Sequence, residues 1–459
     1  MTGGPDLRLV EYGGDGGGNH PLTWAQKWLW RAVALNAPAV QQLNMTASVA
    51  VPEGLGLPRT LRAIGLLIGR HQCLRTRFHV DEHDEPRQVV VRAGGLQAEV
   101  WRADGPADVE ETTARALESL AALPFTAPEI SVRAVVVTDG TGPRRVGLCL
   151  SHLAADDHGL DNLTEDLEEI LRVSAAGAEI PPCRATHPAD RVRYETGADG
   201  VARSAESVRY WTDTTVRFPA EGHLPARHTP DPVPYQSVRM RSRALPVAAQ
   251  ALCARLRVSP TSLVIGLAAV LLCERTGGTR AGFLTFGHNR FSTRARALSG
   301  PLTQSFPVAV DVAGRSLGEV VRATHATVTG AGFHGQYDPP ALAAAFAETA
   351  GENGFAPDLS CAVNVKGERP VPAADGSPEA AAEQARRLLR HTVLSPFTGM
   401  RREDFNFYLS VGMRGREWNV LLRCNTAMIP VAGIEGFLRE LEDRAVHACA
   451  HDTGLLPSG

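Results

Sequence analysis

One segment restricts the possible folds of this chain more than any other, because it contains two strand signals and a helix signal in direct succession. Residues 132–138 and 146–150 are runs of apolar, strand-forming residues, and the Gly- and Pro-containing residues 139–143 between them are a turn signal. Directly afterwards, apolar residues recur at helical spacing from Leu160 to Ile170. The segment predicts two strands joined by a turn and followed by an amphipathic helix, in a mixed α/β fold.

The rest of the chain continues this alternation of helices and strands. Helices are expected at residues 21–35, 57–68, 262–274 and 431–448, and strands at residues 74–80, 283–286, 405–413 and 418–424. Residues 367–383 are rich in Pro, Gly and Ala, which predicts a surface loop or a disordered insertion. The two halves share this mixed α/β rhythm and are similar in size, consistent with an ancient duplication.

The chain has 459 residues, which exceeds what one hydrophobic core usually supports. Residues 175–190 are small and aperiodic and contain proline, so we expect a domain boundary there. The Gly-rich residues 13–18 follow no clear strand, which favours a mobile tail over a phosphate-binding loop. The predicted organisation is a mobile tail at residues 1–20, an N-terminal lobe with the histidine motif at residues 21–180, and a C-terminal lobe at residues 181–459.

Composition argues against several classes of partner. The formal net charge is −3, which offers no basic field for holding nucleic acid. The longest apolar run, Leu263 to Cys273, is shorter than the roughly 18 residues of a membrane span, and the N-terminus resembles no secretion signal. The eight cysteines form no C-x-x-C pair, and several lie in apolar runs, as buried reduced thiols do. We expect a cytoplasmic protein that binds neither nucleic acid nor a membrane.

The sharpest chemical signal is the sequence Ser-His-Leu-Ala-Ala-Asp-Asp at residues 151–157, where the second strand of the hairpin ends. His152 would be held there by the strand and could accept a proton from an attacking amine or hydroxyl. Asp156 could orient a neighbouring group or form a buried ion pair. Ser151 is a poor candidate nucleophile, because adjacent strand residues point to opposite faces. A metal cluster of His152, Asp156, Asp157 and His158 is disfavoured by the turn geometry, so no metal is expected.

Several segments, in this order, resemble the condensation domains of nonribosomal peptide synthetases, and together they span nearly the whole chain. The matching segments are PLTWAQ at residues 21–26, RHQCLRTRF at 70–78, SHLAADD at 151–157, Tyr210-Trp211, GHNR at 287–290, GPLTQSFP at 300–307, Asn364 and Cys424-Asn425-Thr426. No single segment is decisive, but their common order is hard to obtain by accident.

The resemblance implies two chloramphenicol-acetyltransferase-like lobes in a V-shaped pseudo-dimer, with a central tunnel that two carrier proteins approach from opposite faces. The family's catalytic second histidine corresponds to His152. The family's motif aspartate is mainly structural and is held by an arginine from the other lobe, and the matching pair here is Asp156 and Arg290. Three further positions in the family's later motifs are assigned to the tunnel and its support: Gln304, Ser305 and Asn364.

Two residues depart from the family's H-H-x-x-x-D-G motif. Ser151 replaces the first histidine, and we expect it to reshape the site without silencing it. Asp157 replaces the glycine and adds bulk and negative charge near the reacting carbonyl, although it could instead cap the following helix. A double aspartate also resembles noncatalytic, enzyme-recruiting relatives, but those lack the second histidine, which this chain keeps as His152. Both departures therefore stay among the candidate site residues.

The function implied is that of a free-standing acyltransferase in natural-product (antibiotic) biosynthesis. It would join a carrier-bound acyl or aminoacyl thioester to an amine, or less favourably a hydroxyl, on a small or carrier-bound acceptor. Acyl and peptidyl carrier proteins would act in trans and supply phosphopantetheine, so no bound cofactor is expected, and the protein would be a monomer. Two alternatives stay open, namely a catalytically silent docking module and a coenzyme-A-dependent acyltransferase of the same superfamily.

Overall fold

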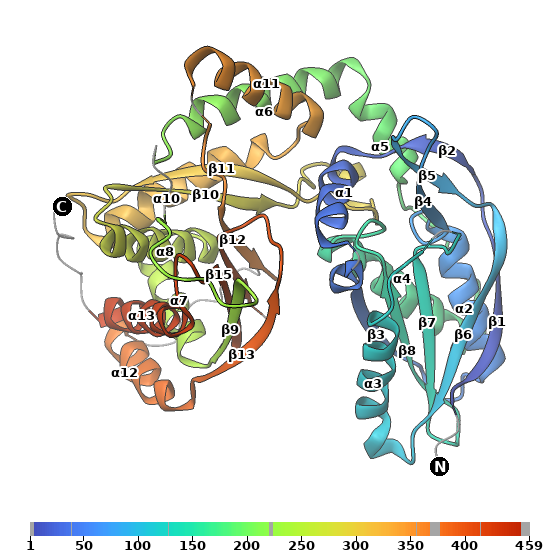
Figure 1. The fold of residues 1–459 in the computed structure, drawn as a ribbon. Helices are drawn as coiled ribbons and strands as arrows, with labels where there is room; N and C mark the ends of the chain where they lie inside the picture. Colours follow the sequence, from blue (N-terminus) through green and yellow to red (C-terminus); the bar gives the residue numbers. More distant parts are fainter. Residues whose placement is uncertain are drawn as a thin grey trace. The chain divides into compact units, whose positions relative to one another are not determined.

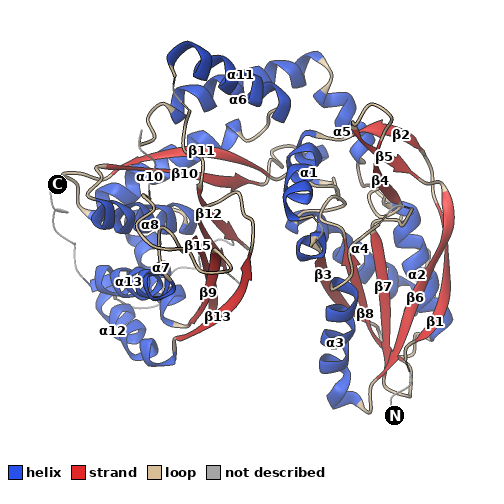
Figure 2. Cartoon of the chain, viewed as in Figure 1, coloured by secondary structure: helices blue, strands red, loops and turns tan. Residues whose placement is uncertain are grey.

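The computed structural model describes residues 4–450 except Pro38, Ala127, residues 220–223, Phe355, residues 368–376 and Arg414. The chain forms two compact units (Figure 1). The first contains the chain up to Ala202 together with His288–Thr303, and the second contains Arg203–Gly287 and the chain from Gln304 onward. Helices and strands alternate within both units (Figure 2), which confirms the expected mixed α/β class.

The first unit contains a five-stranded sheet with the order β1-β6-β7-β8-β3 and a three-stranded sheet with the order β2-β5-β4. Its strands are β1 (Asp6–Gly13), β2 (Gly18–Pro21), β3 (Met45–Ala50), β4 (Thr76–Val80), β5 (Pro86–Val90), β6 (Ala93–Arg102), β7 (Val132–Thr138) and β8 (Pro143–Leu150). Its helices are α1 (Trp24–Asn36), α2 (Leu57–Arg70), α3 (Val109–Ala121), α4 (Asp157–Ala175), α5 (Pro188–Glu195) and the short α9 (Thr293–Arg296).

The hairpin predicted from the sequence is the pair β7 and β8, and both faces of this pair are buried. Val136 and Leu148 pack with α2 and α4 in one core, whereas Val135 and Val137 pack with α3 in another. A strand that is covered on both faces has a nearly continuous apolar sequence, as residues 132–138 do. This burial holds the end of β8, where the candidate catalytic loop begins.

The prediction of a mobile tail at residues 1–20 is wrong for the described residues 4–20. All of β1 pairs with β6 in antiparallel register, from Asp6 opposite Val100 to Gly13 opposite Ala93. The Gly-rich connection to β2 is held by the buried guanidinium of Arg75, which donates to the backbone carbonyl of Gly16 at 3.0 Å. The tail is therefore ordered because a strand and a side chain distant in sequence satisfy its backbone.

The first unit also extends beyond the boundary expected near residue 180, because α5 packs against the start of α1. The buried carboxylate of Glu195 accepts a hydrogen bond from the backbone N–H of Trp24 at 2.8 Å. Arg191, one turn earlier in α5, donates to the same carboxylate at 2.8 Å. These contacts join α5 to the N-terminal unit, and the chain divides after Ala202.

The second unit contains a seven-stranded mixed sheet with the order β11-β10-β12-β14-β15-β9-β13. Its strands are β9 (Tyr235–Ser242), β10 (Arg280–Gly287), β11 (Gln304–Asp311), β12 (Cys361–Lys366), β13 (Val393–Met400), β14 (Phe407–Gly412) and β15 (Trp418–Asn425). Its helices are α7 (Ala244–Leu256), α8 (Pro260–Thr276), α10 (Leu317–Ala331), α11 (Pro339–Asn353), α12 (Pro378–Leu388) and α13 (Val431–Ala450), and α6 (Ala198–Thr215) crosses from the first unit into it.

Helix α8 forms the centre of the second core, as its apolar sequence predicted. It is buried on nearly every side, among α7, α10, α13 and the sheet. The loop expected at residues 367–383 is wrong at its end, because Pro378 begins α12 and the Ser377 hydroxyl caps that helix by accepting from the N–H of Ala380 at 3.3 Å. Residues 368–376 of this expectation lie outside the described residues.

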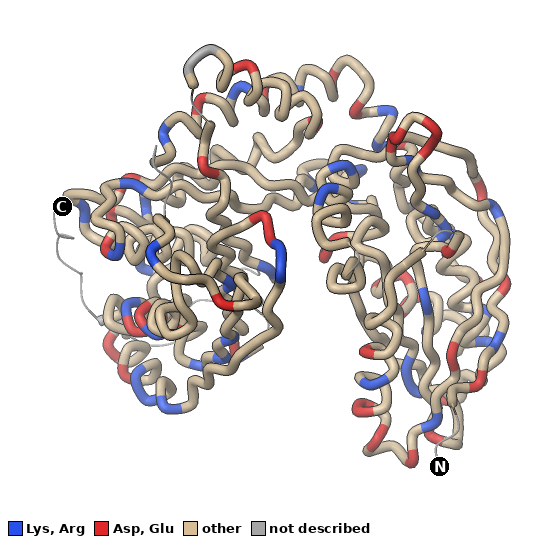
Figure 3. Tube along the Cα trace, in the orientation of Figure 1, with Lys and Arg blue, Asp and Glu red and all other residues tan. Residues whose placement is uncertain are grey.

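Acidic and basic residues are interspersed along both units (Figure 3), in keeping with the net charge of −3. Among the described residues, a single helix of sufficient length and hydropathy to cross a membrane is absent. The bent pair α7 and α8, with 101° between the two helices, meets those criteria only when both are taken together.

Candidate active site

The candidate site begins where β8 ends, and the strand holds the backbone of its first residues. The N–H of Ser151 donates to the carbonyl of Ser131 at 3.2 Å, and the N–H of Ala154 returns to the carbonyl of Ser151 at 2.9 Å. The half-buried ring of His152 has its Nδ1 2.9 Å from the carbonyl oxygen of Ala155. Because a carbonyl only accepts, Nδ1 carries the proton in this contact and Nε2 is the basic nitrogen of the neutral ring.

Asp156 is the N-cap of α4, and its buried carboxylate accepts six hydrogen bonds. Arg290 donates two of them, at 2.8 and 2.7 Å, in a bidentate ion pair. The others come from the N–H of Gly159 at 2.8 Å, the N–H of Leu302 at 2.9 Å, and the N–H and hydroxyl of Thr303 at 3.0 and 2.8 Å. Burial alone would raise the pKa of Asp156, but Arg290 and the amide donors outweigh it and hold that pKa well below its usual range.

The predicted ion pair of Asp156 and Arg290 is therefore present, but it does not join two lobes. Arg290 lies in the segment 288–303, which connects β10 to β11 and belongs to the first compact unit. Besides the carboxylate, the buried guanidinium donates to the carbonyls of Gly300 at 2.9 Å and Leu298 at 3.3 Å. One side chain thus organises both the loop after His152 and the segment that carries Arg290 itself.

Close backbone approach explains two residues beside this ion pair. A Cβ atom on Gly159 would lie 2.1 Å from the carbonyl oxygen of Ser299, so only glycine lets the segment 288–303 contact α4 at this point. Asn289 has a φ of 55°, a left-handed conformation that asparagine tolerates better than most residues. Its buried side chain closes the segment by donating to the carbonyl of Leu302 at 2.8 Å.

The family model of the condensation domain matches residues 17–441. The chain belongs to the condensation-domain family. Condensation domains form amide or ester bonds, an acyltransferase-type reaction, with substrates bound to carrier proteins. The match extends over both compact units, so the predicted resemblance of the chain to this family is confirmed.

Similar curated proteins are large synthetases. The chain is 28% identical over 260 residues to a probable nonribosomal peptide synthetase, CymA, of Salinispora arenicola (strain CNS-205), a match that covers 55% of the chain and 3% of CymA. It is 22% identical over 268 residues to the hybrid PKS-NRPS synthetase ucsA of Acremonium sp, covering 56% of the chain and 6% of ucsA. The chain thus spans only a small fraction of the length of these relatives.

Solved structures confirm the fold as that of condensation domains, with its chloramphenicol-acetyltransferase-like architecture. The SgcC5 protein from Streptomyces globisporus superposes with a TM-score of 0.72 at 19% identity, covering 95% of this chain and 100% of SgcC5. The first condensation domain of the calcium-dependent antibiotic synthetase gives 0.68 at 18% identity, over 95% and 98% of the two chains. A mutant starter condensation domain of rhizomide synthetase RzmA, in complex with C8-CoA and Leu-SNAC, gives 0.68 at 15% identity, over 95% and 96%.

Ser151 and Asp157, the two residues that depart from the condensation-domain motif, lie directly before and after residues 152–156. The half-buried Ser151 accepts a hydrogen bond from the N–H of Leu153 at 3.4 Å, so its hydroxyl helps to form the turn that holds the loop. The sequence left open that Asp157 caps the helix. In the structure the N-cap of α4 is Asp156, so this possibility is wrong. Asp157 is instead the first residue of α4, where a negative charge is stabilised by the helix dipole.

The three predicted tunnel residues lie in the second unit of this condensation domain, in two separate groups. Gln304 and Ser305 are buried at the start of β11 and both contact Tyr337, through its carbonyl at 2.9 Å and its hydroxyl at 3.3 Å. Asn364 lies on β12 and donates to the hydroxyl of Tyr408 on β14 at 3.0 Å. The structure therefore brings Ser151, His152, Asp156, Asp157 and Arg290 together, while their roles and the tunnel roles of the other three remain predictions.

Sequence reasoning gave no role to His288, although it stands in a matching motif. Its Nδ1 accepts the N–H of Arg290 at 2.9 Å, and its ring centroid lies 5.0 Å from that of His158 at the start of α4. Burial lowers the pKa of His288, and the nearby His158 and Arg290 lower it further. His288 thus remains neutral more readily than an ordinary histidine and shapes the turn that delivers Arg290.

Proposed function

We propose that this condensation domain joins a carrier-bound acyl or aminoacyl thioester to an amine, with hydroxyl acceptors as the less favoured substrates. The observation that carries the proposal is the orientation of His152. Its Nδ1 donates to the carbonyl of Ala155, which makes Nε2 the proton acceptor, and the adjoining Asp156 is fixed by six hydrogen bonds. A base on a rigid support is what proton transfer in a transition state needs.

In the proposed reaction the acceptor nitrogen attacks the thioester carbonyl and forms the new C–N bond. His152 Nε2 takes the proton that the nitrogen loses, and the C–S bond breaks. The released phosphopantetheine thiolate then takes that proton from His152, so the products are an amide and a free thiol and the histidine is neutral again. Most of the rate would come from holding the two tethered reactants together, and His152 would add the contribution of a positioned base.

The proposal extends to partners and context. Acyl or peptidyl carrier proteins would bring their phosphopantetheine arms in trans to a free-standing, monomeric enzyme in natural-product (antibiotic) biosynthesis. All eight cysteines, each in a described part of the chain, are free thiols, and seven are buried. These reduced thiols support a cytoplasmic location.

Two specific observations favour other functions. The changed motif residues Ser151 and Asp157 favour a catalytically silent docking module that recruits enzymes to a carrier. The RzmA starter domain that binds C8-CoA has the same fold, which favours coenzyme A as a source of the acyl group. The retained His152, in the orientation described, is why we place the carrier-dependent condensation first.

The deciding experiment supplies a loaded donor carrier and an amine acceptor and follows product by intact-protein mass spectrometry. The wild type should form a new amide, and His152→Ala should cut turnover roughly 10²–10⁴-fold while leaving carrier binding intact. His83→Ala, a change to an exposed histidine on the turn between β4 and β5, is the matched control and should retain most of the turnover.

Each alternative predicts a different result in the same assay. Acyl-coenzyme A that reacts as well as the loaded carrier would favour the coenzyme-A-dependent reaction. Carrier binding without product in both the wild type and His152→Ala would refute the catalytic proposal and favour the docking module.

A further inference from the structure

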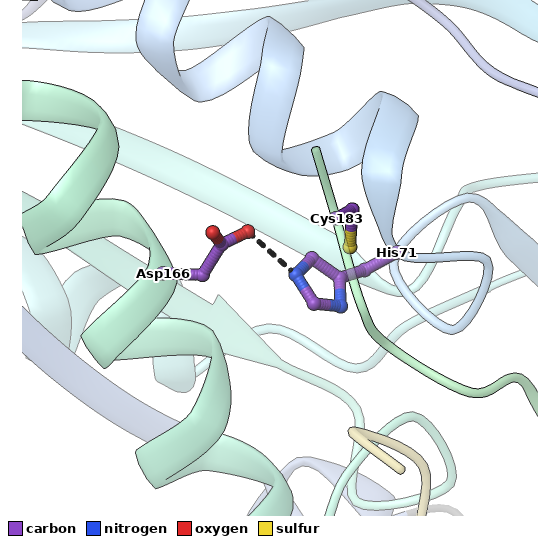
Figure 4. A group of neighbouring side chains, drawn as sticks. All are labelled: His71, Asp166 and Cys183. Atoms are coloured by element: carbon purple, nitrogen blue, oxygen red, sulfur yellow. Dashed lines mark hydrogen bonds and ion pairs between the residues drawn. The ribbon is translucent and has the colours of Figure 1, made fainter. Parts of the chain in front are cut away.

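Three side chains with metal-binding atoms lie close together within the first unit, and the proposed reaction does not use them. His71 follows α2, Asp166 lies in α4, and Cys183 lies in the connection between α4 and α5 (Figure 4). One ligand atom from each lies within 4.8 Å of the other two. An imidazole nitrogen, a carboxylate oxygen and a thiolate sulfur together form a donor set that suits zinc.

The imidazole of His71 is already oriented for this role. Its ring is buried, with Nε2 2.9 Å from Asp166 Oδ2 and Nδ1 3.1 Å from the hydroxyl of Ser299. Without a metal, Nε2 donates to the carboxylate and Nδ1 accepts from Ser299. With a metal on Nε2, the ring proton is on Nδ1, which donates a hydrogen bond to the Ser299 hydroxyl. This reversal is possible because a hydroxyl can donate or accept a hydrogen bond. A metal-binding histidine usually has such a partner on its other nitrogen.

The carboxylate of Asp166 is held so that one oxygen stays directed at His71. Oδ1 pairs with the guanidinium of Arg70 at 2.6 Å, and the Asp166 side chain is only 18% exposed. Arg70 also donates to the carbonyl of Pro181, which holds the connection that carries Cys183 against α2. Arg70 therefore orients Asp166 and the cysteine segment together.

Cys183 supplies the third ligand and the route of entry. It is the exposed cysteine of the chain, whereas the other seven are buried. Its sulfur accepts the N–H of Ala185 at 3.5 Å. With zinc bonds of about 2.0–2.3 Å, ligand atoms in a tetrahedral site lie roughly 3.3–3.8 Å apart. His71 Nε2 and Asp166 Oδ2 are 2.9 Å apart, so these two atoms would separate slightly on binding, and the exposed Cys183 segment would bring its sulfur to the same ion.

We propose that His71 Nε2, Asp166 Oδ2 and Cys183 Sγ bind one zinc-class divalent ion, with a fourth position open to water. Binding breaks the His71–Asp166 hydrogen bond and releases the thiol proton of Cys183 to solvent, with no change of oxidation state. The ion ties the connection before α5 to α2 and α4. Through Ser299 it also ties these helices to the segment 288–303, so it stabilises the unit that contains the candidate active site. This binding does not depend on the proposed condensation activity.

The test uses the full, untagged chain, stripped with a chelator and then titrated with Zn²⁺ against a chromophoric competitor. We expect one ion per chain by elemental analysis, a higher melting temperature on binding, and no competition by Mg²⁺. Co²⁺ in place of Zn²⁺ should give a near-ultraviolet thiolate-to-cobalt charge-transfer band. Ser299→Ala should weaken zinc binding about 10–100-fold, and Cys183→Ser should weaken it further and remove the band.

Cys183→Ser is the decisive variant, because Cys183 is exposed and its replacement should not disturb folding. His83→Gln, which changes an exposed histidine on the turn between β4 and β5, is the control and should bind zinc like the wild type. Absence of stoichiometric zinc in the wild type, a cobalt complex without the thiolate band, or unchanged affinity in Cys183→Ser would each overturn the proposal. None of these measurements depends on catalysis, so their failure is distinct from a failure of the proposed function.

Discussion

Replacing Arg290 by alanine should destabilise the first unit by about 3–5 kcal/mol, because it strands a buried carboxylate. The side chains of Arg290 and Asp156 are each 3% exposed. The variant removes two of the six donors to Asp156 and leaves those of Gly159, Leu302 and Thr303. At about 1.5–3 kcal/mol for each hydrogen bond to a charged group, the two lost bonds account for a loss of that size.

The loss should depend on pH in a direction that follows from Asp156. In the wild type the pKa of Asp156 is lowered, so its contribution to stability is present above its unfolded pKa of about 3.9 and is lost as pH falls below that value. Without Arg290 the largest cause that lowers this pKa is gone, so the pKa of the same carboxyl is higher in the variant than in the wild type, and the ionised form contributes less stability. The difference in unfolding free energy between the two proteins should therefore be larger at pH 7 than at pH 4.

The assay is urea unfolding followed by circular dichroism, with Arg444→Ala as the matched control. Arg444 forms the same bidentate contact with Glu274, at 3.0 and 2.9 Å, but both side chains are about one third exposed. An exposed pair contributes about 0–1 kcal/mol, so the control isolates the effect of burial. For a domain of this size the Arg290 loss corresponds to a melting temperature lower by roughly 6–20 °C.

The reasoning would be refuted if Arg290→Ala were no less stable than Arg444→Ala. A variant as stable as the wild type but inactive in the condensation assay would place Arg290 in direct chemistry and remove its structural assignment. An Asp156→Asn change in the Arg290→Ala background should recover part of the lost stability at pH 7, because it removes the stranded charge.

Three further predictions concern other residues of the first unit. Ser151→Ala should fold normally and keep much of the condensation activity, and a loss as complete as that of His152→Ala would show that the hydroxyl has a chemical role. Gly159→Ala should lower the melting temperature, because its Cβ would lie 2.1 Å from a carbonyl oxygen. The control is Gly177→Ala at an exposed position, where the new Cβ meets no atom within 4 Å and only the strain of a φ of 65° is added. Burial raises the pKa of Glu195 to about 7 despite Arg191, so the contribution of Glu195 to stability is lost as pH rises from the pKa of the unfolded state towards 7. Glu195→Gln should therefore make the free energy of unfolding, measured with urea, depend less on pH between pH 5 and 7. An unchanged slope would contradict the raised pKa.

The amino-acid sequence by itself predicted several local elements and the position of the candidate site. The hairpin at residues 132–150 and the helix after it were predicted from the spacing of apolar residues that lie close together in the sequence. The order of the motifs identified the condensation-domain family, and its pattern placed His152 in the loop and paired Asp156 with Arg290. These inferences succeeded because they rest on short-range pattern or on the register of a family.

Only the tertiary structure decided which distant groups complete those elements. The strand at Asp6–Gly13 was not predicted from the sequence, and it forms because β6 supplies its hydrogen-bond partners. Arg290 proved to belong to the same unit as Asp156, and His71 proved to join Asp166 and Ser299. Such contacts depend on backbone and side-chain groups far apart in the chain meeting after packing, and local sequence carries no periodic trace of them.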